Sequence, residues 1–355
     1  MGICVWCLDD GYGDNKMFNG RQEFLIPSYA TPWRQKMKSD IKDDNPAPLS
    51  YLGVEVDGVR YLVGQGALEQ DVSIHWAGGE NKHVDKIFPV LLKTCLAVLA
   101  DGISRPVVEP LVMGLPVKAD EQEDRHRLLQ ELVVGVHDVS LNMNGEWTPK
   151  KKIHVKELVA KKQPFLSFCD VVLDKHGRIK DETVAGQFNT IIDIGSRTLN
   201  IYTVDALDPI TDLSDTTTQG IYTAYEMVAD FIEEQFRFRI PTGKMPNFIR
   251  RKTIKGMDLT PVIERAYSVL ANEIVRVVHT KFVDSWAYVD RIFITGGGSE
   301  LLRKYLEDAF PVTPQFLGRF ATARGGWKYG IRHALKRKGE ITIDLPGGGA
   351  QKVMP

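Results

Sequence analysis

The sequence lacks the features that mark a membrane protein, a nucleic-acid-binding protein or a disulfide-bonded protein. No apolar run reaches the roughly 18 residues that cross a bilayer, so we expect no membrane partner. Lysine and arginine number 45 against 46 aspartates and glutamates, and the net charge of −1 gives no electrostatic reason for direct contact with DNA. Of the four cysteines, Cys4 and Cys7 form a C-x-x-C, but no second Cys or His pair has metal-binding spacing, which predicts reduced thiols in a cytoplasmic protein.

The composition is that of an ordinary globular protein, with 43% hydrophobic and 26% charged residues in a chain of 355, a length that suits two domains. Hydrophobic periodicity predicts strands at residues 3–8, 16–18, 23–29, 51–56, 59–63, 106–113, 136–143, 153–159, 190–192, 199–204 and 291–295. It predicts helices at residues 85–100, 120–133, 224–236, 259–281, 300–309 and 324–336, with a basic surface excursion at 237–255. Strand triplets begin near residues 3 and 190, so the pattern suggests a duplicated α/β unit.

Two turns rich in Asp and Gly each follow an apolar strand and lead into a returning strand. The first reads Asp9-Asp10-Gly11-Tyr12-Gly13-Asp14-Asn15-Lys16, and the second reads Asp193-Ile194-Gly195-Ser196-Arg197-Thr198. Two such hairpins facing each other could clasp a phosphate chain, because glycines let backbone N–H groups approach phosphate oxygens. Asp9 and Asp193 would then hold a divalent cation. A carboxylate buried without a partner is costly, which favours this interpretation over an Asp that only caps its own turn.

Further residues suit phosphoryl transfer. Lys16 offers a point charge for phosphate oxygens, and Gln163 can orient a water by hydrogen bonds although it cannot take a proton. Gly296, Gly297 and Gly298 leave room for a purine, and Ser299 is expected to cap the helix that follows. Glu264, on the long helix 259–281, is a weaker candidate for contact with the base, since most charges on that helix form a solvated face. Asp170 and Asp174 are reserve candidates for activating water.

The chain resembles the superfamily of actin, Hsp70 and sugar-kinase ATPases, most of all the ParM-type bacterial actins that segregate plasmids and their archaeal actin-like relatives. Residues 9–16 look like the first phosphate loop, Asp193-x-Gly195-x-x-Thr198 like the second, and residues 294–299 like the adenosine motif. Gly114-Leu115-Pro116 matches a strand end of the prokaryotic group, Gln163-Pro164 resembles the position that orients the attacking water, and residues 321–330 look like the returning C-terminal segment. The order and spacing of these motifs along nearly the whole chain are specific to the superfamily.

The resemblance implies an α/β fold with two ribonuclease-H-like lobes around a nucleotide cleft. Domain I would hold residues 1–186 plus 321–340, domain II would hold 187–320, and 341–355 would be a flexible tail. ATP, with GTP also possible, would bind with Mg²⁺ held by Asp9 and Asp193, and the catalytic residues would be Gln163, Asp9, Asp193 and Lys16. The expected nucleotide contacts are Asp10, Gly11, Tyr12, Gly13, Asp14, Asn15, Lys16, Gly195, Ser196, Arg197, Thr198, Glu264, Gly296, Gly297, Gly298 and Ser299.

Three positions depart from the family pattern. Asp14 stands where ParM-type chains usually have Asn, and its carboxylate would repel a triphosphate unless a cation intervenes or the side chain turns away. Asn200 stands where the family often has Asp, which removes a carboxylate from the edge of the second loop. Arg197 is bulkier than is usual there and could reach a phosphate or a partner subunit.

The function implied by the resemblance is an ATPase that assembles into a filament of its own copies. Such a filament would push plasmid DNA apart through an adaptor protein bound at a centromere-like site, and the protein would not touch DNA itself. Two alternatives remain open at this point. One is a phosphotransferase of the sugar-kinase kind, and the other is an actin-like scaffold that does not hydrolyse nucleotide.

Overall fold

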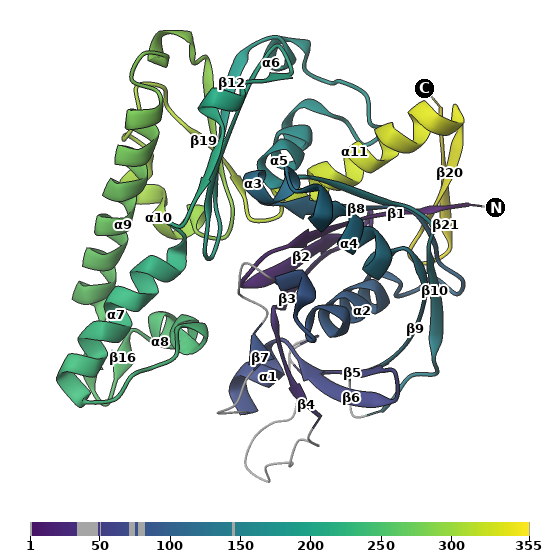
Figure 1. Cartoon of the computed structure of the whole chain (residues 1–355), viewed down its shortest axis with the longest axis horizontal. Coiled ribbons are helices and arrows are strands. Elements are labelled where there is room, and N and C mark those ends of the chain that lie inside the picture. The colour runs from purple at the N-terminus through teal and green to yellow at the C-terminus, as the bar shows by residue number, and fades with distance from the viewer. Residues whose placement is uncertain are drawn as a thin grey trace.

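The computed structural model describes residues 2–33, 49, 51–70, 75–76, 82–143 and 146–354, which form two lobes (Figure 1). Lobe I is built on the larger sheet and contains both ends of the described chain. Lobe II is built on a smaller sheet and carries the long helix α9 (Thr260–Lys281) on its outer side. Among the described residues, no helix is long and apolar enough to cross a membrane.

The sheet of lobe I contains eleven strands within the described residues, in the order β3-β2-β1-β8-β10-β9-β5-β6-β4-β7, with β11 paired to β8. Their bounds are β1 (Cys4–Asp10), β2 (Asp14–Phe18), β3 (Glu23–Pro27), β4 (Tyr29–Pro32), β5 (Leu52–Val56), β6 (Val59–Val63), β7 (His75–Trp76), β8 (Val107–Leu115), β9 (Gly135–Asn142), β10 (Lys151–Val155) and β11 (Leu158–Lys162). Every residue of β1 is buried, because helices cover both faces of this part of the sheet.

The two faces of β1 belong to different parts of the core. Trp6 and Leu8 pack with α2 (Phe88–Leu99), around which the sheet curls, whereas Val5 and Cys7 pack with α11 (Ala321–Lys338). The remaining helices of lobe I are α1 (Gln65–Gln70), α3 (Val117–Asp120), α4 (Glu123–Val133) and α5 (Gln163–Val172), and the short α6 (Glu182–Ala185) precedes the sheet of lobe II. All four cysteines are buried and free, as the sequence predicted.

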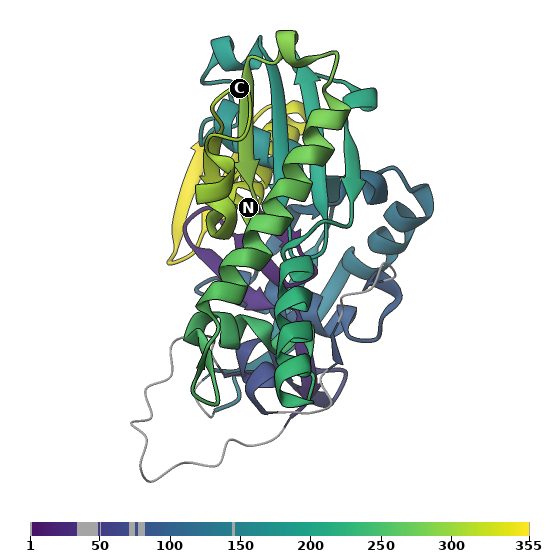
Figure 2. The ribbon, with the colours of Figure 1, turned by 90° about the vertical axis from the view of Figure 1, so that its left-hand side faces the viewer.

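Lobe II repeats the central arrangement of lobe I. Its sheet has the order β14-β13-β12-β18-β19, with β15 paired to β13, and β12 lies antiparallel to β13 and parallel to β18 just as β1 lies between β2 and β8. The strands are β12 (Phe188–Ile194), β13 (Leu199–Asp205), β14 (Asp208–Pro209), β15 (Asp215–Thr217), β18 (Arg291–Thr295) and β19 (Gln315–Gly318). Helices α7 (Ile221–Phe236) and α10 (Ser299–Leu306) pack with α9, and Figure 2 shows α9 running the length of this lobe.

Helix α5 joins the two lobes. Its Leu166 packs in the lobe I core with Trp327 of α11, and its Phe168 packs in a separate core with Phe293 of lobe II. The sequence did not predict this helix, and it predicted one strand at residues 153–159 where the structure has β10 and β11. Gln163 is the first residue of α5, so the helix that packs with both lobes begins at the cleft between them.

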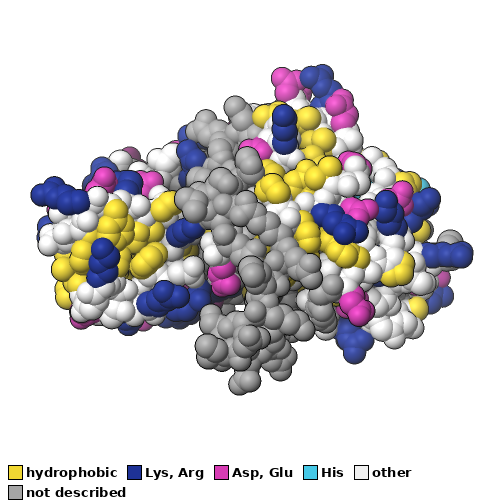
Figure 3. Space-filling model, turned by 90° about the horizontal axis from the view of Figure 1, so that it is seen from below, with side chains coloured by type: hydrophobic (Ala, Val, Ile, Leu, Met, Phe, Trp, Pro, Cys, Tyr) yellow, Lys and Arg dark blue, Asp and Glu magenta, His cyan; other side chains and the backbone are white. Residues whose placement is uncertain are grey.

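Two other segments contain helices or strands that the sequence did not predict. The basic excursion contains α8 (Met245–Arg251) and β16 (Thr253–Ile254), which forms a small hairpin with β17 (Met257–Asp258) just after it, at the lower end of lobe II. Figure 3 shows Lys and Arg side chains beside hydrophobic ones at this end. The predicted flexible tail instead forms a hairpin, β20 (Ile341–Leu345) and β21 (Gly349–Val353). Ile343 is buried beside Ile3, whose backbone N–H donates to Thr342 and whose carbonyl accepts from Asp344. The expected boundary between residues 186 and 187 stays a prediction.

Candidate functional site

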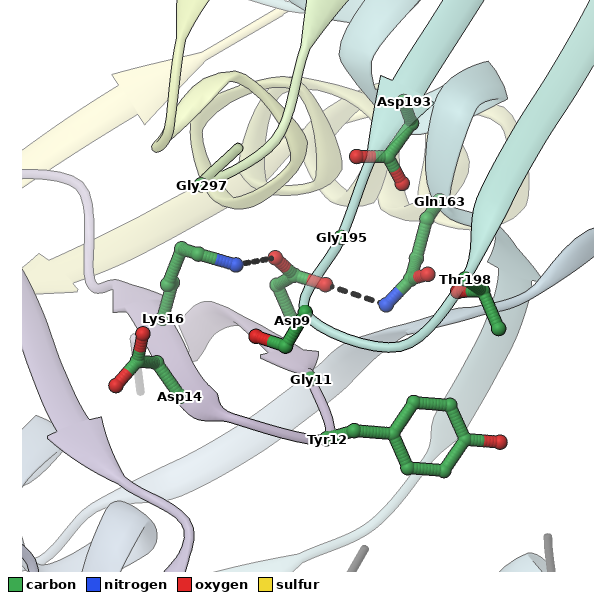
Figure 4. Close-up of a pocket in the computed structure, with 11 residues that line it drawn as sticks. Asp9, Gly11, Tyr12, Asp14, Lys16, Gln163, Asp193, Gly195, Thr198 and Gly297 are labelled. Atoms are coloured by element: carbon green, nitrogen blue, oxygen red, sulfur yellow. Dashed lines mark hydrogen bonds and ion pairs between the residues drawn. The ribbon is translucent and has the colours of Figure 1, made fainter. Parts of the chain in front are cut away.

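The two Asp-Gly turns line one pocket between the lobes (Figure 4). Asp9 ends the apolar part of β1, where it is paired with Lys16 on β2 and Gly114 on β8. Asp193 has the same place in lobe II, paired with Asn200 on β13 and Thr295 on β18. The residues that line the pocket are Asp9, Gly11, Tyr12, Asp14, Lys16, Gln163, Asp193, Gly195, Ser196, Thr198 and Gly297. Strands from separate lobes thus deliver their carboxylates to a shared space.

Asp9 has two buried partners in this pocket. Lys16 Nζ lies 2.9 Å from Asp9 Oδ2, and Gln163 Nε2 donates a hydrogen bond to Asp9 Oδ1 at 2.7 Å. Burial alone would lower the pKa of Lys16, but Asp9 and Asp14 outweigh that effect and raise the pKa. Lys16 is therefore a fixed positive charge beside the carboxylate, in a position to meet an anionic ligand.

Asp193 lies in a different electrostatic environment. Burial, followed by the nearby charge of Asp9, raises the pKa of Asp193 to about 7, although Lys16 and a hydrogen bond from Asn200 oppose the shift. Gly296, with a φ of +89°, leaves space for this side chain, since a Cβ there would lie 2.4 Å from Asp193 Oδ1. A carboxyl held in this way gains from a cation that would stabilise its charged form.

The donor set fits a hard divalent cation shared with a phosphate ligand. The described part of the chain contains no group of three or more His, Cys, Asp or Glu side chains able to hold a metal. Asp9 and Asp193 nevertheless supply two carboxylates at one pocket, and Mg²⁺ is usually held by one or two carboxylates together with substrate phosphates and water. The convergence of these two buried carboxylates on one pocket is the observation that favours a cation here.

A larger cleft of about 650 Å³ continues from this pocket and shares Asp14, Lys16, Ser196 and Gly297 with it. Gly13 and Glu264, two other residues singled out from the sequence, line this cleft as well. Glu264 is at the same time bonded to Lys304 and Tyr305 of α10, which holds its pKa below the usual range through hydrogen bonds from Lys304 and then Tyr305. The Glu264 carboxylate at the wall of the cleft is thus already hydrogen-bonded to other side chains of lobe II.

Sequence reasoning missed the residues that dominate the larger cleft. Four tyrosines line it, together with Ile221, Leu301 and Arg319; these tyrosines are Tyr29, Tyr222, Tyr225 and Tyr267. The hydroxyls of Tyr29 from lobe I and Tyr222 from lobe II are hydrogen-bonded at 3.2 Å, so the two lobes touch across the cleft. The i, i+3 spacing of Tyr222 and Tyr225 was the one signal in the sequence that placed two of these rings on a single helical face.

Several expected contact residues line neither cavity. Asp10 Oδ2 is paired with His83 Nε2 at 2.9 Å, and Asn15 Nδ2 donates to Ser28 Oγ at 3.2 Å, all four side chains being buried or nearly so. These two turn residues therefore stabilise the loop through contacts outside the pocket. Arg197, Gly296, Gly298 and Ser299 are likewise absent from the lining of both cavities.

The predicted role of Ser299 as a helix cap is wrong. Ser299 is the first residue of α10, the N-cap position belongs to Gly298, and no side chain caps that end. The Ser299 hydroxyl instead donates to the carbonyl oxygen of Gly296 at 2.7 Å. This bond fixes the glycine turn that passes behind Asp193.

Two of the three departures from the family pattern now have a structural context. The Asp14 carboxyl lines both cavities, and burial raises its pKa although Lys16 and Arg319 act in the opposite direction. Asn200 is fully buried and its amide contacts Asp193 and Thr198. The Arg197 side chain does not line the cleft.

The fold and the pocket define a class: two α/β lobes of matching topology, each presenting an Asp-Gly hairpin to a common cleft, form an actin-like ATPase fold. Family profiles agree with this. The profile described as the N-terminal domain of actin-like proteins matches residues 7–165, and that of the C-terminal part of the archaeal MreB-like actin homologue matches residues 191–308. The chain belongs to the actin-like ATPase superfamily.

Individual relatives share this fold at low sequence identity. An archaeal actin homolog of Thermoplasma acidophilum is 27% identical over 152 residues, a match that spans 39% of this chain and 45% of that protein. A ParM from a 15-stranded filament of Clostridium botulinum has a TM-score of 0.76 at 17% identity, covering 94% of this chain and 100% of that one. A Bacillus thuringiensis ParM solved with ATP has a TM-score of 0.67 at 17% identity, covering 94% and 100%.

Proposed function

We propose that this protein is a nucleotide-driven ATPase that binds ATP and Mg²⁺ between its lobes and assembles into filaments. The observation that carries the proposal is the convergence of the two Asp-Gly hairpins on one pocket that also holds Lys16 and Gln163. The similarity in fold to a ParM solved with ATP supports a nucleotide in this position. We keep GTP as a second candidate substrate beside ATP.

Different residues of the pocket would contact the phosphates and the metal ion. The backbones at Gly11 and Gly195 would approach phosphate oxygens, and Lys16 would supply a positive charge. Asp9 and Asp193 would hold Mg²⁺, which when bound neutralises charge that develops on the phosphates. Lobe closure around the ligand would exclude water other than the one that reacts.

We propose that Gln163 orients the attacking water. Its amide lies at the start of α5 and points at Asp9, so it sits inside the pocket with a fixed direction. An amide can both donate to and accept from water but cannot remove its proton. This chemistry suits slow hydrolysis, so that the rate of hydrolysis would set how long the lobes stay closed.

Loss of the γ-phosphate would weaken the bridge between the lobes and release their closure. We propose that this change drives assembly and disassembly of a homopolymer, as the similarity to a ParM filament structure suggests. Plasmid DNA segregation through a centromere-binding adaptor is the biological role that we propose for such a filament. The net charge of −1 supports an indirect rather than a direct contact with DNA.

A single mixing experiment tests the proposal. Purified protein is mixed with Mg-ATP, and light scattering and phosphate release are followed together without added sugar. Assembly followed by phosphate release supports a filament-forming ATPase. Production of ADP that depends on sugar, without assembly, would indicate a phosphotransferase, and the absence of both signals would indicate a scaffold that does not hydrolyse nucleotide.

A further inference from the structure

Asn200 occupies a buried junction between the lobes. It lies on β13 directly opposite Asp193 on β12 and opposite Thr216 on β15, so it is flanked by strands on both sides. None of its surface is exposed. A buried primary amide is costly unless its donors and acceptors are satisfied, and such a residue is therefore informative about what surrounds it.

Both ends of the Asn200 amide are used. Nδ2 donates to Asp193 Oδ2 and to Thr198 Oγ1, both at 3.4 Å. Oδ1 accepts from the backbone N–H of Val117 at 3.3 Å and from Thr216 Oγ1 at 2.8 Å. One end of the side chain thus faces the pocket, and the other end faces lobe I.

The contact with lobe I is made at the first turn of α3. The first N–H groups of a helix have no partner within the helix, and Pro116, at the N-cap position, provides no side-chain cap. Asn200 accepts from the first of these groups, on Val117, and Thr216 Oγ1 accepts from the next, on Lys118, at 3.2 Å. Lys118 Nζ also lies 2.8 Å from Asp215. Side chains of lobe II therefore complete a helix of lobe I.

We propose that Asn200 is a positioning residue that links the Asp193 carboxylate to the seating of α3 on lobe II. When α3 is seated, Val117 and Thr216 fix the orientation of the amide, and Nδ2 points at Asp193. When the lobes separate, the amide loses the Val117 contact, and the Thr216 hydroxyl remains as the donor to Oδ1. This inference rests on the proposed function, because it makes efficient hydrolysis depend on contact between the lobes at this junction.

The hydrogen bonds of Asn200 also explain why this residue is an amide rather than a carboxylate. A carboxylate at residue 200 could accept from Val117 and Thr216 but could not donate to Asp193, and it would place a further negative charge beside Asp9 and Asp193. The amide performs both tasks without adding charge. An amide at residue 200 therefore links Asp193 to lobe I in a way that a carboxylate could not.

Thr216 offers a test that leaves the pocket itself untouched. Thr216→Val removes the hydroxyl that orients Asn200, whereas Thr216→Ser retains it. We expect Thr216→Val to lower the rate of ATP hydrolysis by roughly three- to tenfold, the scale of one lost hydrogen bond, with the nucleotide dissociation constant changed by less than about twofold. Thr216→Ser should restore the rate. A wild-type rate in Thr216→Val would overturn the proposal.

Two controls separate positioning from general destabilisation. Thr203→Val removes a buried hydroxyl of the same sheet that bonds the Leu213 carbonyl, and it should reduce stability without reducing the rate of hydrolysis. Asn200→Ala combined with Thr216→Val should be no slower than Asn200→Ala alone, because the two residues act in one chain of contacts. Additive losses in the double variant would contradict the link.

Hydrogen exchange keeps this test distinct from that of the proposed function. The N–H groups of Val117 and Lys118 should exchange faster in Thr216→Val than in wild type, and Thr216→Ser should protect them again. A wild-type protein that releases no phosphate would refute the proposed function, while this exchange pattern would still support the contact. Equal exchange in all three proteins would overturn the link whatever the rate of hydrolysis.

Discussion

Gln163 and Asp9 are hydrogen-bonded inside the pocket, Nε2 to Oδ1 at 2.7 Å, although 154 positions separate them in the chain. The bond joins the start of α5 to the end of β1, and both side chains are buried. Gly114 lies beside them, and a Cβ there would be 3.0 Å from Gln163 Cγ and 3.4 Å from Asp9 Oδ1. A glycine at this strand end leaves the two side chains room to meet.

The first prediction concerns Gln163→Ala. This change removes the amide that would orient water, while Lys16 and the glycine turns remain, so hydrolysis should slow by about 100-fold, the scale of a misplaced reactant. Nucleotide affinity should change far less, and the comparison of single-turnover hydrolysis with equilibrium binding checks this. Gln187→Ala, which removes a distant Gln bonded to Arg291, is the control. Weakened binding with little change in rate would remove Gln163 from the mechanism.

The second prediction concerns Asp193→Ala. Loss of a proposed Mg²⁺ ligand should abolish phosphate release, which we expect to fall by more than about 100-fold because the ion stabilises transition-state charge by several kcal/mol. Asp205→Ala, at the exposed far end of the neighbouring strand, should behave as wild type. Circular dichroism of both variants controls for folding. Turnover equal to that of wild type would exclude a metal role for Asp193.

The third prediction concerns pH and follows from the pKa of Asp193, raised from 3.8 to about 7 by burial and by Asp9. Between these values the folded protein keeps a proton that the unfolded chain has released, so this carboxyl stabilises the fold at low pH. That contribution is lost as pH rises through 7. The Tm of the nucleotide-free protein should fall more steeply from about pH 5 to about pH 8 than the Tm of Asp193→Asn. Parallel curves for the two proteins would show that Asp193 has an ordinary pKa.

The fourth prediction concerns the contact between Tyr29 and Tyr222 across the cleft. Tyr29→Phe removes one hydroxyl of this pair and weakens lobe closure, so nucleotide should dissociate roughly two- to tenfold faster, the effect of one hydrogen bond. Stopped-flow release of a fluorescent nucleotide measures this rate. Tyr225→Phe, whose ring lines the same cleft from lobe II, is the matched control. A slower or unchanged release from Tyr29→Phe would mean that the pair does not restrain opening.

The sequence predicted the parts of this site that local patterns encode. Both Asp-Gly hairpins were predicted because each is a strand, a turn and a returning strand within a short stretch of chain. The strands β1, β12 and β18 are apolar and buried, and their hydrophobic runs located them to within about two residues, the usual uncertainty at element ends. The resemblance then gave the fold class, which the structure and the family profiles confirm.

The parts that were missed depend on distant packing. Residues 163–172 form a helix because α5 fits closely against α11, where a Cβ on Gly325 would lie only 1.8 Å from the Leu166 carbonyl oxygen. The C-terminal hairpin depends on Ile3, at the other end of the chain. The tyrosines of the cleft come from β4, α7 and α9, and no local pattern shows that their rings converge. Such contacts appear only when the lobes are assembled.

The most direct test of the account is a crystal structure of the protein with Mg²⁺ and a non-hydrolysable ATP analogue. We predict that the phosphates lie between the turns at Gly11 and Gly195, with the ion beside Asp9 and Asp193 and the base in the cleft lined by tyrosines. Phosphates bound elsewhere, or turns that have moved apart with solvent between them, would contradict the claim that one ligand bridges both lobes.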